Sequence, residues 1–224
     1  MTQILLGGDS WACGEWARPE GAPGHVPVEI VHRGIEQYFI DDGFGVVNTA
    51  EGGSSNKSAV ERLAAVVDDH YDYVIWIQTD PIRDLRPYDS FNQEFTSYNL
   101  LLEYSKQALA NTYEKLNQFG VPVYCMGGCS KLDPAIDRYQ NLVVMIPSLI
   151  EFLIPGRAAP EIWTSDWIRK FDRSTNIDMM DRLSKEKWNQ DTLDRVELFQ
   201  PDGAHPNRTA LRLVYNFIRE RYIK

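Results

Sequence analysis

The sequence of 224 residues has few cysteines, with one thiol each at positions 13, 125 and 129. A small and odd number argues against a disulfide framework and makes a reducing compartment the default. Cys125 and Cys129 flank Met126-Gly127-Gly128 after an apolar run, but the further ligands that a metal site needs are not found near them. We therefore expect buried thiols, with no metal and no cofactor.

Long hydrophobic runs and clusters of basic residues are also missing. The apolar run that begins at Ile4 is too short for a signal peptide and lacks a basic flank, and no segment approaches the length of a membrane span. The net charge is −9 and the pI is near 5.0. We expect a cytoplasmic protein whose partners include neither nucleic acid nor a membrane.

No internal repeat, low-complexity stretch or interdomain linker interrupts the chain. With 43% hydrophobic and 25% charged residues, residues 1–224 can form one α/β domain with a sizeable core. Apolar runs alternate with helical patterns, which is typical of a parallel sheet with helices on both faces. The patterns predict strands near 3–7, 44–49, 73–78, 121–126 and 141–146, and helices near 33–41, 55–70, 97–119 and 206–222.

The N-terminal run Ile4-Leu5-Leu6 leads directly into Gly7-Gly8-Asp9-Ser10. Glycines permit a tight turn after a buried strand, so this pattern can hold a serine hydroxyl at the edge of a sheet. An ordinary strand followed by a loop has the same pattern. Cys13 is a second candidate nucleophile, but Ser10 fits the end of the strand better.

Asp202 and His205 stand three residues apart in a turn before the last predicted helix. A serine hydroxyl becomes a nucleophile when a neutral imidazole takes its proton, and a carboxylate on the other ring nitrogen fixes the tautomer. The spacing lets Asp202 reach one nitrogen of His205 while the other faces outward. A Pro/Gly turn with an Asp helix cap is the alternative.

The Gly-Asp-Ser turn at Ser10 and the Asp-x-x-His turn at Asp202 and His205 together resemble the SGNH (GDSL-like) hydrolase superfamily. The resemblance implies a flavodoxin-like three-layer α/β/α sandwich with a five-stranded parallel sheet. It also implies a Ser-His-Asp triad at the carboxyl ends of the strands.

The resemblance implies two further sequence blocks between these end motifs. Gly53, next to Gly52, matches the glycine whose N–H contributes to the oxyanion hole, although the same segment is an ordinary helix start. The third block departs from the family pattern, because Gln78 replaces the glycine and Asp80 replaces the asparagine donor. An ionised Asp80 cannot donate, so Asp80 is protonated, the Gln78 amide donates, or the third donor is missing.

Residues 147–200 are not explained by the minimal fold. They contain three tryptophans and several prolines, and their position before His205 suits either a lid with short helices or packing on an edge of the sheet. If they form a wall, an aromatic residue of this stretch should line a pocket at Ser10 together with Trp11. Arg83 and Arg86 follow the third block and can pair with Asp80, contact a substrate or face solvent.

We therefore predict a serine esterase that hydrolyses a small acyl ester, with O-acetyl groups on a carbohydrate as one candidate substrate. A catalytically weakened relative that binds a glycan or a protein partner through the same cleft is the alternative, favoured by Asp80. A flavodoxin-like nucleotide binder fits less well, because Asp9 places a carboxylate where phosphate would bind. The oligomeric state and the acyl group are left open.

Overall fold

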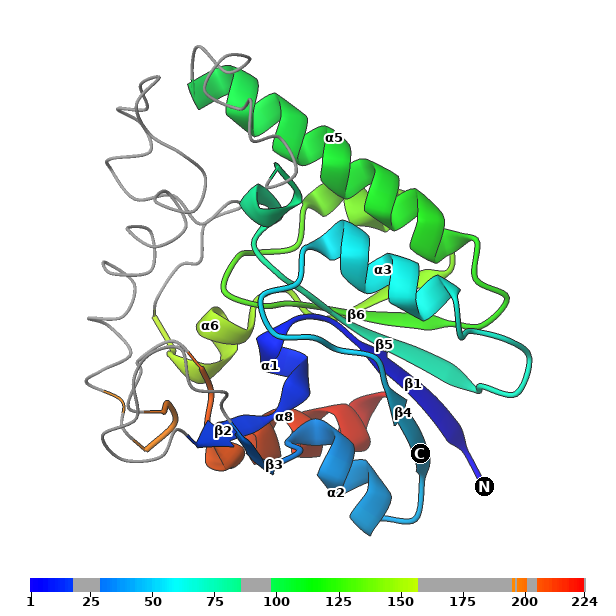
Figure 1. The fold of residues 1–224 in the computed structure, drawn as a ribbon, viewed down its shortest axis with the longest axis vertical. Coiled ribbons are helices and arrows are strands. Elements are labelled where there is room, and N and C mark those ends of the chain that lie inside the picture. Colours follow the sequence, from blue (N-terminus) through cyan, green and yellow to red (C-terminus); the bar gives the residue numbers. More distant parts are fainter. Residues whose placement is uncertain (18–28, 86–97, 157–194, 196, 201–204, 224) are drawn as a thin grey trace.

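A computed structural model describes residues 1–17, 29–85, 98–156, 195, 197–200 and 205–223 (Figure 1). A five-stranded sheet has the order β4-β1-β5-β6-β7, and every neighbouring pair is parallel. This is the strand order of flavodoxin-like folds, so the predicted sheet is confirmed. The strands are β1 (Gln3–Gly7), β4 (Gly45–Asn48), β5 (Tyr73–Gln78), β6 (Val123–Gly127) and β7 (Leu142–Ile146).

Helices cover both faces of the sheet and complete the three-layer α/β/α sandwich (Figure 1). One face carries α1 (Ser10–Cys13), α2 (Ile35–Asp41), α6 (Leu149–Leu153) and α8 (Arg208–Arg221). The other face carries α3 (Asn56–Ala64) and α5 (Tyr98–Asn117), with the short 3-10 helices η1 (Pro81–Leu85) and η2 (Pro134–Arg138) nearby.

The alternation of side chains along β1 explains why its sequence is continuously apolar. Ile4 and Leu6 pack into the cluster under α2 and α8, whereas Leu5 belongs to the cluster under α3 and α5. Both faces of the strand are therefore buried, as expected for a central strand of a parallel sheet.

The helix predicted at 55–70 ends earlier, at Ala64. The next residues include Val66, Val67 and two aspartates, which have low helix propensity, and the turn closes with the Val67 amide donating to the Leu63 carbonyl at 2.8 Å. The last predicted helix buries the residues expected of it, namely Leu211, Val214, Tyr215 and Ile218.

A two-stranded antiparallel hairpin of β2 (Glu15–Ala17) and β3 (Glu29–His32) was not predicted. Its strands are short and carry charged residues, so they lack an apolar alternation. Of the segment 147–200, the structure describes residues 147–156, which include α6, and residues 195 and 197–200. The three tryptophans of this segment, Trp163, Trp167 and Trp188, lie outside the described residues, as do the short helices expected there, so the lid stays a prediction.

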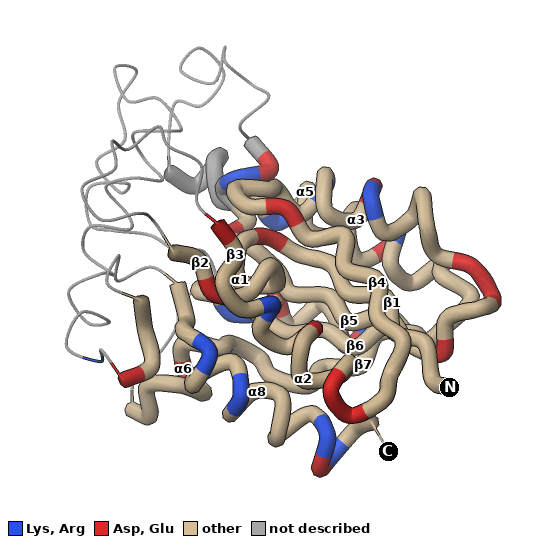
Figure 2. The backbone as a smooth tube through the Cα atoms, turned by 60° about the horizontal axis from the view of Figure 1, so that its bottom comes forward, with Lys and Arg blue, Asp and Glu red and all other residues tan. Residues whose placement is uncertain are grey.

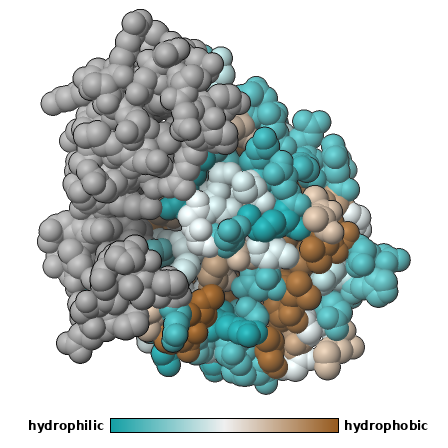
Figure 3. Space-filling view, in the orientation of Figure 1, coloured by the Kyte–Doolittle hydropathy of each residue, from teal (hydrophilic) through white to brown (hydrophobic). Residues whose placement is uncertain are grey.

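Basic positions follow α8 in Figure 2. Their guanidinium groups are engaged within the chain: Arg208 pairs with Glu15, Arg219 pairs with Asp42, and Arg212 and Arg221 lie over the rings of Tyr38 and Phe217. On the face shown in Figure 3, hydrophilic residues (teal) lie between areas of hydrophobic residues (brown). Among the described residues, no helix is both long and apolar enough to span a membrane.

Candidate active site

Ser10 lies at the carboxyl end of β1, as the first residue of α1. Asp9 caps this short helix, because its Oδ1 accepts the Trp11 amide at 3.0 Å. The Asp9 carbonyl also accepts the Ala12 amide at 3.0 Å, so the turn is fixed on both sides of Ser10. The nucleophile candidate is thus buried and held by its own backbone turn.

Gly8 allows this turn to lie directly against β5. It has a φ of +152°, and an added Cβ would lie 2.7 Å from the carbonyl oxygen of Ile77. A side chain at this position would push the turn away from the neighbouring strand. The glycine before Asp9 therefore sets how deeply Ser10 sits at the sheet edge.

His205 lies on a loop that is closed by a small antiparallel bridge between Phe199 and Pro206. The Gln200 amide donates to the carbonyl of His205 at 2.8 Å, and the Gln200 side chain donates to the carbonyl of Pro206 at 3.1 Å. Asn207 then caps α8 by accepting the Ala210 amide at 3.1 Å. The backbone of His205 and Pro206 is therefore held by Gln200, and the chain continues directly into the capped start of α8.

The two ends of the chain meet at this point. Nε2 of His205 lies 2.9 Å from Oγ of Ser10, across 195 residues of sequence. In the tautomer with its proton on Nδ1, the imidazole accepts a hydrogen bond from the serine hydroxyl. Asp202, expected on the other ring nitrogen, lies outside the described residues.

Trp16, on β2, borders this pair of side chains and was missed in the sequence. Its ring centroid lies 5.6 Å from that of His205, with an angle of 50° between the planes. The other end of the indole packs on Gly52, where an added Cβ would lie 2.5 Å from Cη2. Trp16 therefore spans the distance between the imidazole and the glycine loop.

Trp11, which we expected to line the pocket, is instead a core residue. It is buried, belongs to the cluster under α2 and α8, and packs edge-on against Phe199 with ring centroids 6.4 Å apart. Because Trp11 lies in α1 immediately after Ser10, the turn that presents the hydroxyl directs the following side chain into the interior.

Besides the Trp11 amide, the Asp9 carboxylate has two side-chain partners. Oδ2 accepts the Thr79 hydroxyl at 2.7 Å and Nη1 of Arg83 at 2.9 Å, and Nη1 also donates to the Thr79 hydroxyl at 3.0 Å. All three residues are buried. One partner of Arg83 is therefore Asp9, an arrangement that we did not predict, whereas Arg86 lies outside the described residues.

Gln78 does not donate to a group at Ser10, contrary to one of our alternatives. Its Nε2 donates to the carbonyl of Lys131 at 3.2 Å, and its Oε1 accepts the hydroxyl of Tyr113 at 2.9 Å. Tyr113 belongs to the cluster under α3 and α5, whereas α1, which begins at Ser10, packs into the cluster on the opposite face of the sheet. The alternation of side chains along β5 thus directs Gln78 away from the candidate nucleophile.

Asp80 and Gly53 occupy the two remaining positions of the family blocks. Asp80 is buried just beyond β5, and its carbonyl accepts the Arg83 amide at 3.0 Å. Gly53 lies in the loop before α3 with a φ of +75°. A cavity of about 290 Å³ opens beside this loop, lined by Glu51, Gly52, Gly53, Ser54, Ser55, Ser58, Arg62 and Arg83.

The thiol of Cys13 is a poor nucleophile in this position. Burial, followed by the charge of Asp9, raises the pKa of Cys13 to about 12. Its Sγ lies 3.4 Å from the carbonyl oxygen of Asp9, to which it donates. Because the thiolate is the reactive form, this environment favours Ser10 over Cys13.

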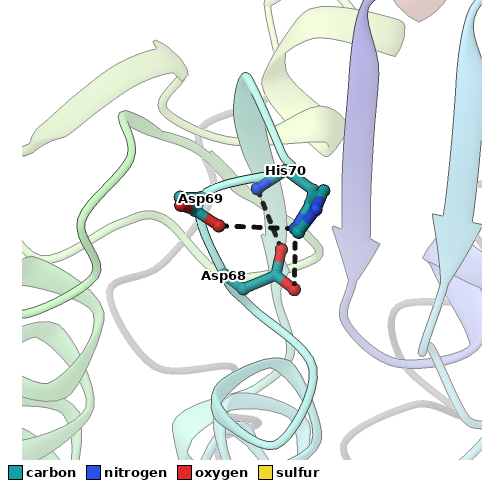
Figure 4. A group of neighbouring side chains, drawn as sticks. All are labelled: Asp68, Asp69 and His70. Atoms are coloured by element: carbon teal, nitrogen blue, oxygen red, sulfur yellow. Dashed lines mark hydrogen bonds and ion pairs between the residues drawn. The ribbon is translucent and has the colours of Figure 1, made fainter.

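At the opposite, amino edge of the sheet, Asp68, Asp69 and His70 gather before β5 (Figure 4). Nδ1 of His70 lies 3.3 Å from a carboxylate oxygen of each aspartate. All three side chains are exposed. Exposed groups of this kind occur commonly without an ion, and the cluster has no further ligand among the described residues.

Comparison with solved structures gives distant structural neighbours. No family model and no curated protein matches the chain. Psychrotrophic esterase EstA from Pseudoalteromonas sp. shares 13% identity and a TM-score of 0.45, over 98% of this chain and 96% of that one. A Bacillus subtilis protein shares 15% identity and a TM-score of 0.45, over 99% of this chain and 57% of that one.

LAE5, an α/β hydrolase enzyme from the metagenome of Lake Arreo, Spain, shares 16% identity and a TM-score of 0.39, over 98% of this chain and 94% of that one. The assignment of the fold rests on the chain's own sheet topology and layers.

Proposed function

We propose that this protein is a serine esterase of the SGNH type that hydrolyses a small acyl ester, with O-acetyl groups on a carbohydrate as a candidate substrate. One observation carries the proposal, namely the distance of 2.9 Å between Oγ of Ser10 and Nε2 of His205. A serine hydroxyl at hydrogen-bond distance from an imidazole is the geometry that nucleophilic acyl transfer requires.

In the proposed reaction, Oγ of Ser10 attacks the ester carbonyl while Nε2 of His205 takes the hydroxyl proton. The tetrahedral intermediate collapses as the imidazolium gives this proton to the departing alcohol, which leaves an acyl group on Ser10. Water then attacks the acyl-enzyme, with His205 again acting as base and then as acid, and releases the carboxylic acid. We assign the orientation of His205 to Asp202.

The negative charge on the tetrahedral intermediate would be stabilised by the N–H groups of Ser10 and Gly53. The third donor of the family is missing or supplied by a protonated Asp80, since the amide of Gln78 is engaged by Tyr113 and Lys131. Loss of one such donor typically lowers turnover about 10²–10³-fold, which weakens an esterase without abolishing it.

Hydrolysis of p-nitrophenyl acetate by the wild type and by Ser10→Ala tests the proposal. Ser105→Ala is the matched control, because Ser105 is a buried serine on α5 whose hydroxyl has no hydrogen-bond partner in the part of the chain that the structure describes. We expect Ser10→Ala to lose at least about 10³-fold in kcat and Ser105→Ala to keep the wild-type rate. Equal rates for Ser10→Ala and the wild type would contradict the proposal.

Labelling provides a second measurement that does not depend on the choice of ester. A fluorophosphonate should add to the wild type in a one-to-one ratio, and peptide mapping should place the adduct on Ser10. An adduct on Cys13 or on another serine would assign the chemistry to a different residue.

A catalytically weakened relative that binds a glycan or a protein partner is the second candidate. It is favoured by Asp80, which stands where the family has an asparagine donor, and by the engagement of Gln78 elsewhere. If the folded wild type neither hydrolyses the ester nor is labelled, this second candidate replaces the first.

A further inference from the structure

A buried ion pair lies beside the candidate nucleophile. The Asp9 carboxylate accepts the amide of Trp11, on the far side of Ser10, so the negative charge lies alongside the serine. Nη1 of Arg83 lies 2.9 Å from the same carboxylate, and the exposed fractions of the two side chains are 8% for Arg83 and 6% for Asp9. Few ion pairs of the described residues are so fully removed from water.

A gain in stability does not by itself explain why an ion pair is buried at this position. Removing two charges from water costs about as much free energy as their attraction returns, and an apolar pair of similar volume is often equally stable. The pair does join two separate elements, since Asp9 follows β1 and Arg83 lies in η1 after β5. The Thr79 hydroxyl, bonded to both, completes the connection.

The charge of Asp9 matters for acyl transfer at Ser10. Negative charge develops on the carbonyl oxygen as the serine attacks, and a neighbouring unpaired carboxylate would oppose it. In a site with little water, this opposition is much stronger than in solution. A cation placed directly on the carboxylate offsets the opposition.

We propose that Arg83 is a positioning residue, which neutralises Asp9 and holds the Asp9–Ser10 turn against the end of β5. This inference rests on the proposed esterase function. A second observation agrees with it: Arg83 also lines the cavity of about 290 Å³ that contains Gly53, the candidate oxyanion glycine. The guanidinium thus lies between the nucleophile turn and the glycine loop.

Three variants separate charge compensation from simple folding. Arg83→Met removes the cation and leaves a buried carboxylate. Asp9→Asn keeps the helix cap, because the amide oxygen still accepts from Trp11, but removes the negative charge at position 9 that Arg83 contacts. The double variant Asp9→Asn/Arg83→Met removes both charges, and the new amide can donate to the Thr79 hydroxyl.

The measurements are kcat and KM for p-nitrophenyl acetate, the second-order rate of fluorophosphonate labelling at Ser10, and the folded fraction from near-UV circular dichroism. We expect Arg83→Met to lower kcat by about tenfold or more, with KM changed by less than about twofold, because the lost interaction acts on the transition state. The double variant should recover most of the lost kcat. The kcat of Arg83→Lys should lie between those of the wild type and Arg83→Met, because lysine keeps the positive charge but lacks the planar guanidinium with its several N–H donors.

Two results would overturn the inference. One is a folded Arg83→Met with wild-type kcat. The other is a folded double variant that is as slow as Arg83→Met, because charge compensation would then not be the cause. If Arg83→Met does not fold, the comparison of the double variant with the wild type decides: a folded double variant that keeps most of the wild-type kcat supports charge compensation, and one that is about tenfold or more slower contradicts it.

The proposed function has its own failure signal. If Ser10→Ala hydrolyses the ester like the wild type, or the wild type is neither active nor labelled, the esterase proposal fails and this inference fails with it. If Ser10→Ala is inactive but Arg83→Met is normal, only the inference fails.

Discussion

The two edges of the sheet carry similar residues in different surroundings. At the carboxyl edge, His205 meets Ser10 next to the buried pair of Asp9 and Arg83. At the amino edge, His70 meets Asp68 and Asp69, and its side chain is 83% exposed. Water screens the second group, whereas the first is fixed by a glycine turn, a bridged loop and a helix cap. The difference shows that desolvation and anchoring, rather than residue type, distinguish a candidate active site.

The largest expected contrast is between the two histidines. His205→Gln removes the base and should lower kcat for p-nitrophenyl acetate by at least about 10³-fold, while His70→Gln should change it by less than about twofold. Steady-state kinetics on both purified variants, with circular dichroism as the folding control, measures the difference. A similar loss in both variants would show that histidine chemistry is not confined to the carboxyl edge.

The next contrast concerns stability and compares two aspartates. Asp84 is buried after β5, where Oδ1 accepts the Lys57 amide at 2.8 Å and Oδ2 accepts the Asn56 side chain at 3.0 Å. In Asp84→Asn one of these donors would face an amide N–H, so unfolding free energy should fall by about 1–3 kcal/mol. Asp68→Asn at the amino edge should change it by less than about 0.5 kcal/mol in urea titrations.

The same Asp84 predicts a pH dependence. Burial raises the pKa of its carboxyl above the ordinary value of 3.8, despite the hydrogen bonds that lower it. Between 3.8 and the raised pKa the folded state binds more protons than the unfolded state, so the contribution of Asp84 to stability declines as the pH rises through this window. The stability advantage of the wild type over Asp84→Asn should therefore be larger below pH 3.8 than at neutral pH.

A smaller effect is expected at Trp16, which borders His205 and the glycine loop. Trp16→Ala should enlarge the site and raise the kcat/KM ratio of p-nitrophenyl octanoate to acetate by about tenfold, whereas Trp16→Phe should keep most of the wild-type selectivity. An unchanged ratio in Trp16→Ala would mean that the indole does not bound the acyl group.

The smallest expected effect is at Asp42, in the turn between α2 and β4. A hydrogen bond from the Tyr215 hydroxyl, aided by Arg219, holds the pKa of Asp42 below its ordinary value of 3.8. This contribution to stability is present above pH 3.8 and is lost as the pH falls through the lowered pKa. Because about half of the carboxylate is exposed, with 48% accessible, Asp42→Asn should cost less than about 1 kcal/mol at pH 7 and less at acid pH.

Much of the fold could be predicted from the sequence, because its central strands are buried on both faces and have continuous apolar runs. The meeting of Ser10 with His205 was predicted from the resemblance of the two end motifs to the SGNH superfamily, and the distance between the two side chains agrees with it. The hairpin with Trp16 could not be predicted, because three residues with one glutamate give no strand pattern.

The polar contacts of the site were harder to predict. The sequence suggested Asp80 as the carboxylate partner of Arg83, because it is only three residues away. The pairing with Asp9 depends instead on the neighbouring positions of β1 and β5 in the sheet. Gln78 is the last residue of β5, and successive side chains of a strand point to opposite faces of the sheet, so a shift of one residue would turn Gln78 to the other face. An aligned motif cannot reveal which face the last strand residue takes when the strand end is uncertain by one residue.

The span of 195 residues between Ser10 and His205 has a consequence for synthesis. The serine and its capping turn are made first, and the imidazole is made 195 residues later. A nascent chain that has not yet released residue 205 carries a serine without its base. On the proposed mechanism, the ester-cleaving chemistry is thus withheld until residue 205 and the following helix α8 have been made and α8 has docked on the sheet.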